Sequence, residues 1–118
     1  MSIHWSDDQP IYRQLKDLVV NMILDGSLSE GEALPSVRKV AADYQINPIT
    51  VSKAYQELAE SNVVEKRRGL GMFIRSGAKI SLQESEKQHF LNEEWPKIAS
   101  KIARLGLTID DLLLKHNT

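Results

Sequence analysis

The sequence contains no cysteine, which excludes a disulfide framework and thiolate metal ligands and fits a reducing cytosol. It also contains no apolar run of the roughly 18 to 20 residues that a membrane-spanning helix requires. The first ten residues, MSIHWSDDQP, lack the basic start and the apolar stretch of a signal peptide. We therefore expect a soluble, cytoplasmic protein with no membrane partner.

The sequence also lacks an excess of positive or negative charge. The 118 residues include 15 Lys or Arg and 16 Asp or Glu, and the net charge of −1 argues neither for nor against a nucleic-acid partner. Hydrophobic residues make up 42% of the chain, which is enough for a packed core. The length suits one domain of ordinary size, or one small domain with an extension.

Three helices are expected in the first half of the chain. Pro10 starts a helix that ends near Gly26. Pro35 and Ser36 start a second helix after a polar, turn-rich loop, and Pro48 opens a third.

A β-hairpin is expected next, in the segment VVEKRRGLGMFIR. Two short apolar runs there are joined by a basic, glycine-containing turn. Three helices followed by such a hairpin describe a winged helix-turn-helix. We therefore predict a mainly α fold with a small β-hairpin, in which a domain at residues 1–76 precedes a short C-terminal helical region at 77–118.

Helical signals continue in the C-terminal region. Ser81 and Glu84 match a capping box that would start a longer helix. Pro96 lies inside this run and predicts a kink just before it. Gly106 ends the helix, and Thr108 caps a last short one.

The third helix begins with poor helix formers. Small and β-branched residues from Ile49 to Ser52 lower its helix propensity. In a helix-turn-helix this helix enters the DNA major groove by its N-terminal end, where hydroxyl and methyl groups contact phosphates and bases. If Val51, Ala54, Tyr55 and Leu58 face the core, the outward residues are Ile49, Lys53 and Gln56, with Thr50 and Ser52 at the flanks.

Basic residues gather in the same region. Residues 36–75 hold seven Lys or Arg against four Asp or Glu, as expected of a surface that binds phosphates. The start of the second helix offers backbone N–H groups to a phosphate, and a glycine lets the hairpin approach a groove closely. The residues concerned are Ser36, Arg38 and Lys39 in the second helix, and Lys66, Arg67, Arg68 and Gly69 in the hairpin.

Each of these features also has a purely structural explanation. Ile49 could be a satellite core contact, the basic hairpin could be an ordinary solvated turn, and Arg38 could pair with Asp43 or Glu57. The alternative function is a winged-helix protein–protein interaction module without DNA binding. Loss of duplex binding with rising salt would favour DNA.

The residues from QPIYRQL to GLGMFI resemble the GntR family of bacterial transcription regulators almost end to end. The matching motifs are PIYxQL, the G-x-L-x-x-G-x-x-LPSVR run, NPxTVxxAYxxL and RRGxGxFI. The short helical tail is similar to that of the YtrA subfamily, whose C-terminal part is a small dimerisation unit. The resemblance implies a DNA-binding transcription factor. We predict a repressor, and the sequence leaves activation open as the alternative.

The resemblance also assigns roles to individual residues. It implies that Arg38 contacts DNA, that the run from Asn47 to Lys53 forms the leading part of the recognition helix, and that the hairpin tip reaches the minor groove. The predicted DNA-binding residues are Ser36, Arg38, Lys39, Asn47, Pro48, Ile49, Thr50, Ser52, Lys53, Lys66, Arg67, Arg68, Gly69 and Gly71.

Two positions depart from the family pattern. The family commonly has glycine in the turns where this chain has Gln45 and Asn62. A left-handed glutamine costs on the order of 1 kcal/mol, whereas asparagine tolerates that conformation. Neither residue is a predicted DNA contact.

The C-terminal region is too short to bury a core on its own. Its apolar row either packs back on the winged helix or pairs with a second copy. We expect a homodimer, because two-fold dimers read the half-sites of palindromic operators and the resemblance implies one. The predicted interface residues are Leu91, Trp95, Ile98, Ile102, Leu105, Ile109 and Leu112.

Nothing in the sequence points to catalysis. Gly69 and Gly71 form a lone GxG without the third glycine or following helix of a phosphate loop. His89 and Glu93 are more typical of a solvated surface pair than of a metal site. We expect no enzyme, no cofactor and no metal, and the sequence leaves open whether a small-molecule effector binds.

Overall fold

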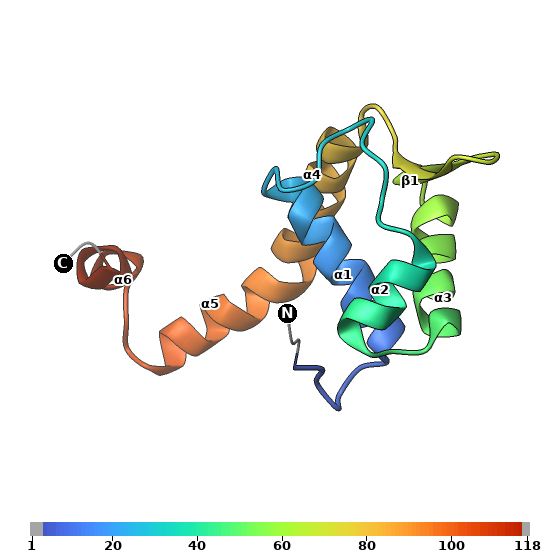
Figure 1. Cartoon of the computed structure of the whole chain (residues 1–118). Helices are drawn as coiled ribbons and strands as arrows, with labels where there is room; N and C mark the ends of the chain where they lie inside the picture. Colours follow the sequence, from blue (N-terminus) through green and yellow to red (C-terminus); the bar gives the residue numbers. More distant parts are fainter. Residues whose placement is uncertain (1–3, 117–118) are drawn as a thin grey trace. The chain divides into compact units, whose positions relative to one another are not determined.

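The computed structural model describes residues 4–116 and confirms three helices, a hairpin and further helices (Figure 1). The chain divides into two compact units, Met1–Gln83 and Glu84–Thr118. The elements in chain order are α1 (Ile11–Leu24), α2 (Val37–Tyr44), α3 (Pro48–Glu60), β1 (Val64–Arg67), β2 (Gly71–Ile74), α4 (Ala78–His89), the π-helical segment η1 (Phe90–Glu94), α5 (Trp95–Arg104) and α6 (Ile109–His116).

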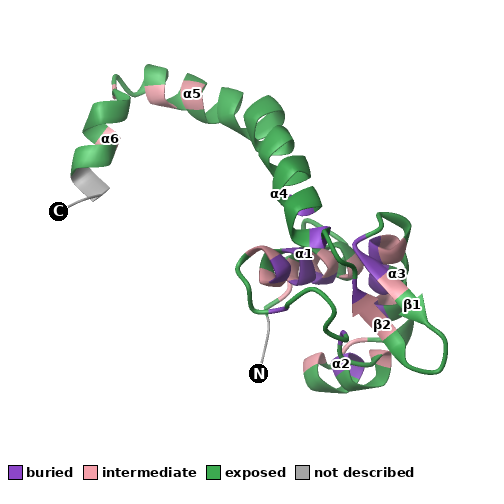
Figure 2. Ribbon diagram, turned by 90° about the horizontal axis from the view of Figure 1, so that it is seen from above, coloured by how far each residue is buried: buried purple, intermediate pink, exposed green. Residues whose placement is uncertain are grey.

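The core of the first unit is formed by the inner faces of α1, α2 and α3 together with the hairpin (Figure 2). Leu15 and Ile23 of α1, Leu58 of α3 and Ile74 of β2 are at most 2% exposed. Burying a side chain of this size contributes about 1.5 to 3 kcal/mol. This core holds α3 at a fixed position against the two preceding helices and the hairpin.

The loop expected before α2 is partly a third extended segment, which is a correction to the sequence prediction. Gly31 N–H donates to the Ile74 carbonyl over 2.8 Å, and Leu34 N–H donates to the Met72 carbonyl over 2.8 Å. Ile74 N–H in turn donates to the Glu32 carbonyl over 2.9 Å. The segment lacks β-formers, so its pairing with β2 depends on the tertiary fold, in which Leu34 is buried.

The start of α4 was also predicted wrongly. The helix begins at Ala78, and Ser81 lies inside it rather than at a cap. Glu30, from the loop after α1, accepts hydrogen bonds from the backbone N–H groups of Gly77 over 2.9 Å and Lys79 over 3.1 Å. A capping carboxylate from such a distant part of the chain leaves no local sequence signal.

In the second unit, the interruption predicted before Pro96 is confirmed. The π-helical segment η1 lies directly before α5, and Pro96 occupies the first turn of α5. The Thr108 cap is confirmed as well, because its Oγ1 accepts from Asp111 N–H over 3.1 Å. No helix in the described part of the chain is long and apolar enough to cross a membrane.

Two non-glycine residues in the described part of the chain adopt left-handed backbone conformations, at the two turns that depart from the family pattern. Gln45 has φ 55° at the end of α2, and Asn62 has φ 62° after α3. These two turns set the directions in which the chain leaves α2 and α3.

Candidate nucleic-acid interface

The first turn of α3 is held by its own cap. Asn47 Oδ1 accepts from Ile49 N–H over 2.9 Å, and Pro48 occupies the first helical position. Both features stabilise a helix start that the following β-branched residues disfavour. Asn47, a predicted DNA contact, therefore has a structural role, and its side-chain amide N–H groups keep their capacity to donate.

The two faces of α3 divide as the sequence predicts. Val51, Ala54 and Leu58 are 0% exposed and Tyr55 is 4% exposed. Ile49 is 75% exposed, so the satellite-core interpretation of this residue is wrong. The remaining predicted residues of the helix are exposed at Pro48, Ser52 and Lys53 and half-buried at Thr50.

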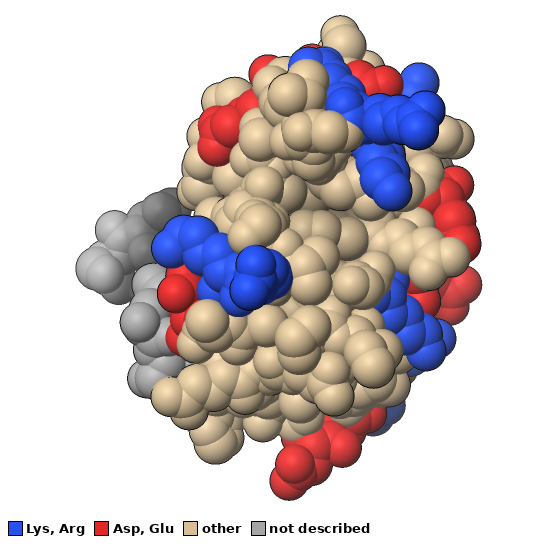
Figure 3. Space-filling view, turned by 45° about the vertical axis from the view of Figure 1, so that its right-hand side comes forward, with Lys and Arg blue, Asp and Glu red and all other residues tan. Residues whose placement is uncertain are grey.

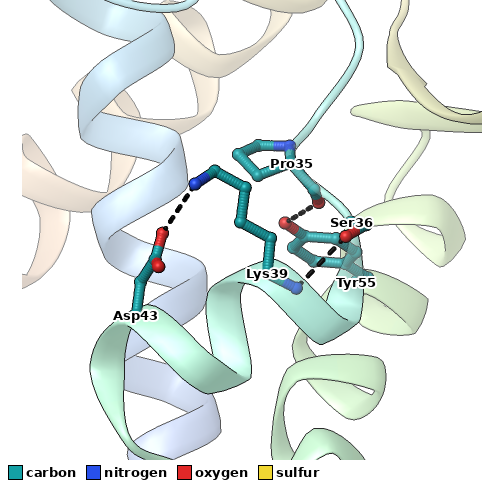
Figure 4. Close-up of polar contacts among 5 residues, drawn as sticks. All are labelled: Pro35, Ser36, Lys39, Asp43 and Tyr55. Carbon is teal, nitrogen blue, oxygen red and sulfur yellow. Dashed lines mark hydrogen bonds and ion pairs between the residues drawn. The ribbon is translucent and has the colours of Figure 1, made fainter.

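A partly buried hydrogen bond fixes α3 to the start of α2. Tyr55 Oη donates to the Pro35 carbonyl over 2.7 Å, directly before the residue that caps α2 (Figure 4). Burial raises the pKa of Tyr55 to about 12, with Tyr44 adding to the effect, so the hydroxyl keeps its proton. The bond thereby links the second half of α3 to the segment directly before α2.

The N-terminus of α2 presents donors to the solvent. Ser36 Oγ accepts from Lys39 N–H over 3.1 Å, so the cap occupies one of the predicted free donors (Figure 4). The N–H groups of Val37 and Arg38 make no hydrogen bond within the described residues. An anion can therefore still bind at this helix end.

Arg38 is exposed and makes no ion pair within residues 4–116. The acids considered as its partners are engaged elsewhere, Asp43 with Lys39 Nζ at 3.1 Å and Glu57 with Lys16 Nζ at 3.6 Å. Both side chains of the Lys39–Asp43 ion pair are more than half exposed, so this pair contributes little to stability. Lys39 can therefore exchange Asp43 for a phosphate at small cost.

Lys53 lies over an aromatic ring rather than against an acid. Its Nζ is 4.0 Å from the centroid of the Tyr12 ring of α1. Such a contact is worth roughly 0.5 to 1 kcal/mol at an exposed site and leaves the positive charge in place.

The hairpin holds its basic residues at the tip. Strand pairing ends at Arg67 and Gly71, and the connecting residues include Arg68 and Gly69, with φ 78° at the glycine. Gly71 itself has φ 111°. Arg67 Cζ lies 4.2 Å from the centroid of the Phe73 ring, and Arg67 Nη2 lies 3.3 Å from Glu65 Oε1. Contacts within the hairpin therefore set the direction of the Arg67 side chain.

Lys66 and Arg68 complete the basic hairpin and are exposed. Figure 3 brings forward the side on which α2, α3 and the hairpin lie in Figure 1. Lys and Arg side chains form separate groups around an uncharged central area, and most Asp and Glu side chains lie toward the margins of this view (Figure 3). The arrangement is that expected of a surface that meets phosphates at several points and uncharged groups between them.

One residue on this surface was missed by the sequence analysis. Leu70, at the hairpin tip, is 71% exposed although it is apolar. The signal that could have revealed it is its place between two glycines in an exposed turn, where it has no core to join.

The predicted interface residues of the second unit lie outside any core. Residues 84–114 include no buried residue, and Leu91, Trp95, Ile98, Leu105 and Ile109 are 36% to 61% exposed. Ile102 and Leu112 are half-buried. An open, mainly apolar hollow of about 270 Å³ is lined by Trp95, Ala99, Ile102, Ala103, Leu107, Thr108 and Ile109.

Comparison with known proteins supplies an independent assignment. The sequence pattern of the family described as "Bacterial regulatory proteins, gntR family" matches residues 11–74. An uncharacterised HTH-type transcriptional regulator, YhcF of Bacillus subtilis, is 32% identical over 113 residues, 96% of this chain and 92% of that protein. The HTH-type transcriptional repressor YtrA of Bacillus subtilis is 35% identical over 103 residues, 87% of this chain and 78% of that protein.

A similar solved structure is the crystal structure of a transcriptional regulator from Oenococcus oeni. It has a TM-score of 0.76 and 30% sequence identity, over 98% of this chain and 94% of that one. The fold and the exposed helix-turn-helix surface define a winged-helix, DNA-binding transcription regulator. The chain belongs to the GntR family and is similar to YtrA.

Proposed function

We propose that the protein acts as a homodimer that binds a palindromic operator and represses transcription. Each protomer inserts the N-terminal half of α3 into a major groove, while Arg38 and the start of α2 hold phosphates. The hairpin tip lies in the adjacent minor groove. The observation that carries this proposal is the exposed start of α3, where Ile49, Ser52 and Lys53 face outward from a helix fixed by Tyr55.

The predicted DNA-binding set divides into two kinds of contact in this proposal. Charged side chains and helix N–H groups bind phosphates and position the protein, but they carry no sequence information. Ile49 and its hydroxyl-bearing neighbours meet base edges, where a methyl group packs against the methyl of thymine. Repression is proposed because YtrA of Bacillus subtilis is a repressor by name.

The second unit supports a homodimer. Its apolar row has no core to join, since none of residues 84–114 is buried. A second copy would cover this row, and a two-fold dimer reads two half-sites about one helical turn apart. Dimerisation also raises the affinity for DNA, because binding of the second recognition helix becomes intramolecular once the first is bound.

The test is selection of bound duplexes from a random pool, with the full chain as bait. We expect an inverted repeat with a fixed spacing, a dimer in sedimentation, and affinity that falls with salt at a log–log slope of several units. An enriched sequence without two-fold symmetry would refute the palindrome. Binding to no duplex at any salt concentration would refute DNA recognition.

A pair of arginine variants tests the assignment of the site. Arg38→Ala should weaken operator binding roughly 10- to 100-fold and reduce the salt slope by about one. Arg104→Ala, which removes the same charge from the second unit, is the matched control and should leave the affinity near that of the wild type. If the two variants bind equally well, Arg38 does not contact DNA.

A further inference from the structure

The wing tip carries an exposed leucine, which the charged residues around it do not explain. Leu70 follows Gly69, and its N–H donates to the Arg67 carbonyl over 2.8 Å to close the turn. Gly69 supplies the positive φ that the third residue of such a turn requires. The turn therefore places Leu70 at a defined position at the end of the hairpin.

In the described part of the first unit, the Leu70 side chain lies outside the core. Leu70 is 71% exposed, whereas the leucines of the core are at most 9% exposed. A single exposed leucine on a protein surface is ordinary. This one is distinguished by its position, because it shares the hairpin with Lys66, Arg67 and Arg68, on the element that approaches DNA in the proposed function.

We propose that Leu70 reads base composition in the minor groove, by packing on the groove floor where A·T pairs lie and disfavouring G·C pairs there. This inference rests on the proposed function. The minor-groove edge of A·T carries only acceptors, while G·C adds the amino group of guanine as a donor. Leucine accepts no hydrogen bond, so it would leave this donor without a partner and collide with it.

The charges beside Leu70 favour the same base pairs. A·T-rich segments have a narrow minor groove with strong negative potential, which attracts arginine. Arg68, next to Gly69 in the turn, is exposed and suited to this potential. Apolar wedges inserted between or against base pairs are an established device of minor-groove binding.

The test uses an operator obtained by selection, with the base pair under the wing changed one step at a time. This base pair is made A·T, G·C or inosine·C. The inosine·C pair keeps the major-groove edge of G·C but lacks the amino group in the minor groove. We expect the wild-type protein to bind A·T and inosine·C alike, and G·C roughly 5- to 10-fold more weakly. Equal binding to G·C and inosine·C would overturn the proposal.

Three variants separate the side chain from the rest of the wing. Leu70→Ala should bind all three duplexes within about twofold of one another, and Leu70→Asn, which can accept from guanine, should shift preference toward G·C. Ile80→Ala, which removes a side chain that is 74% exposed on α4, is the matched control and should keep the wild-type preference. Unchanged discrimination in Leu70→Ala would refute the role of Leu70.

Failure of this inference can be told apart from failure of the proposed function. If the protein binds its selected operator and Arg38→Ala weakens that binding, the function stands whatever the result at the wing. If no operator is selected, the proposed function fails first. Circular dichroism should show each Leu70 variant folded, because the residue makes no core contact.

Discussion

The hydrogen bond between Tyr55 and the Pro35 carbonyl can be removed with almost no change in packing. Tyr55 is only 4% exposed. Tyr55→Phe keeps its ring and deletes only the hydroxyl, which donates to the Pro35 carbonyl over 2.7 Å. The net contribution of one such bond is about 1 kcal/mol. For a domain of this size a loss of 1 kcal/mol lowers the melting temperature by about 5 °C.

Urea unfolding followed by circular dichroism measures this loss directly. The midpoint should fall while the slope of free energy against urea stays constant, because the surface exposed on unfolding is unchanged. Tyr12→Phe is the matched control, since the Tyr12 hydroxyl makes no hydrogen bond within the described residues and its ring stays under Lys53. A Tyr55→Phe midpoint equal to that of Tyr12→Phe would refute the reasoning.

Alkaline pH tests the burial of the same hydroxyl independently. The pKa of Tyr55 is raised from 10.0 to about 12 in the folded protein, so the unfolded chain loses this proton first as pH rises. The folded state then binds more protons, and the stability contribution of the hydroxyl, fully present below pH 10, declines toward about pH 12. The stability difference between wild type and Tyr55→Phe should therefore narrow above pH 10, and a constant difference would contradict burial of the hydroxyl.

Two further predictions concern the turns and the cap of α4. Gln45→Gly should raise the free energy of unfolding by about 1 kcal/mol, because glycine adopts the left-handed conformation of this residue without strain. The gain should exceed that of Asn62→Gly in chemical denaturation, since Asn62 also accepts from Arg75 over 3.3 Å. Backbone N–H groups of Gly77 and Lys79 hold the pKa of Glu30 below 4.5, so the stability that this carboxylate contributes is present above that value and lost as pH falls below it. Wild type should be more stable than Glu30→Gln near neutral pH, and the denaturant midpoints of the two proteins should converge as pH falls below 4.5; a difference that does not shrink with falling pH would contradict the cap.

The helices could be predicted because their signals are local. Pro10, Ser36 and Asn47 lie at the three helix starts, and the apolar spacing of α3 identified its buried face. The order of elements followed from these signals, and with it the winged helix-turn-helix. The exposed start of α3 was likewise predictable, because a helical wheel needs only the positions of the apolar residues.

The corrections concern interactions between residues distant in sequence. The start of α4 was placed too late because its cap comes from Glu30, and the segment around Leu34 was taken for a loop because its pairing partner is β2. Neither interaction leaves a periodic pattern or a local cap motif. The tertiary fold supplies both.

The amino-acid sequence by itself determined the fold class, the family resemblance and the residues that face outward from α3. Only the tertiary structure decided which of the predicted DNA-binding residues are available. Arg38 makes no ion pair in the described residues, where Lys39 and Lys16 engage its candidate partners, and Asn47 Oδ1 is occupied as a cap while its amide N–H groups keep their capacity to donate. The physical reason is that helix and strand periodicity depends on neighbours along the chain, whereas the engagement of a charged or capping side chain depends on which atoms folding brings within a few ångströms.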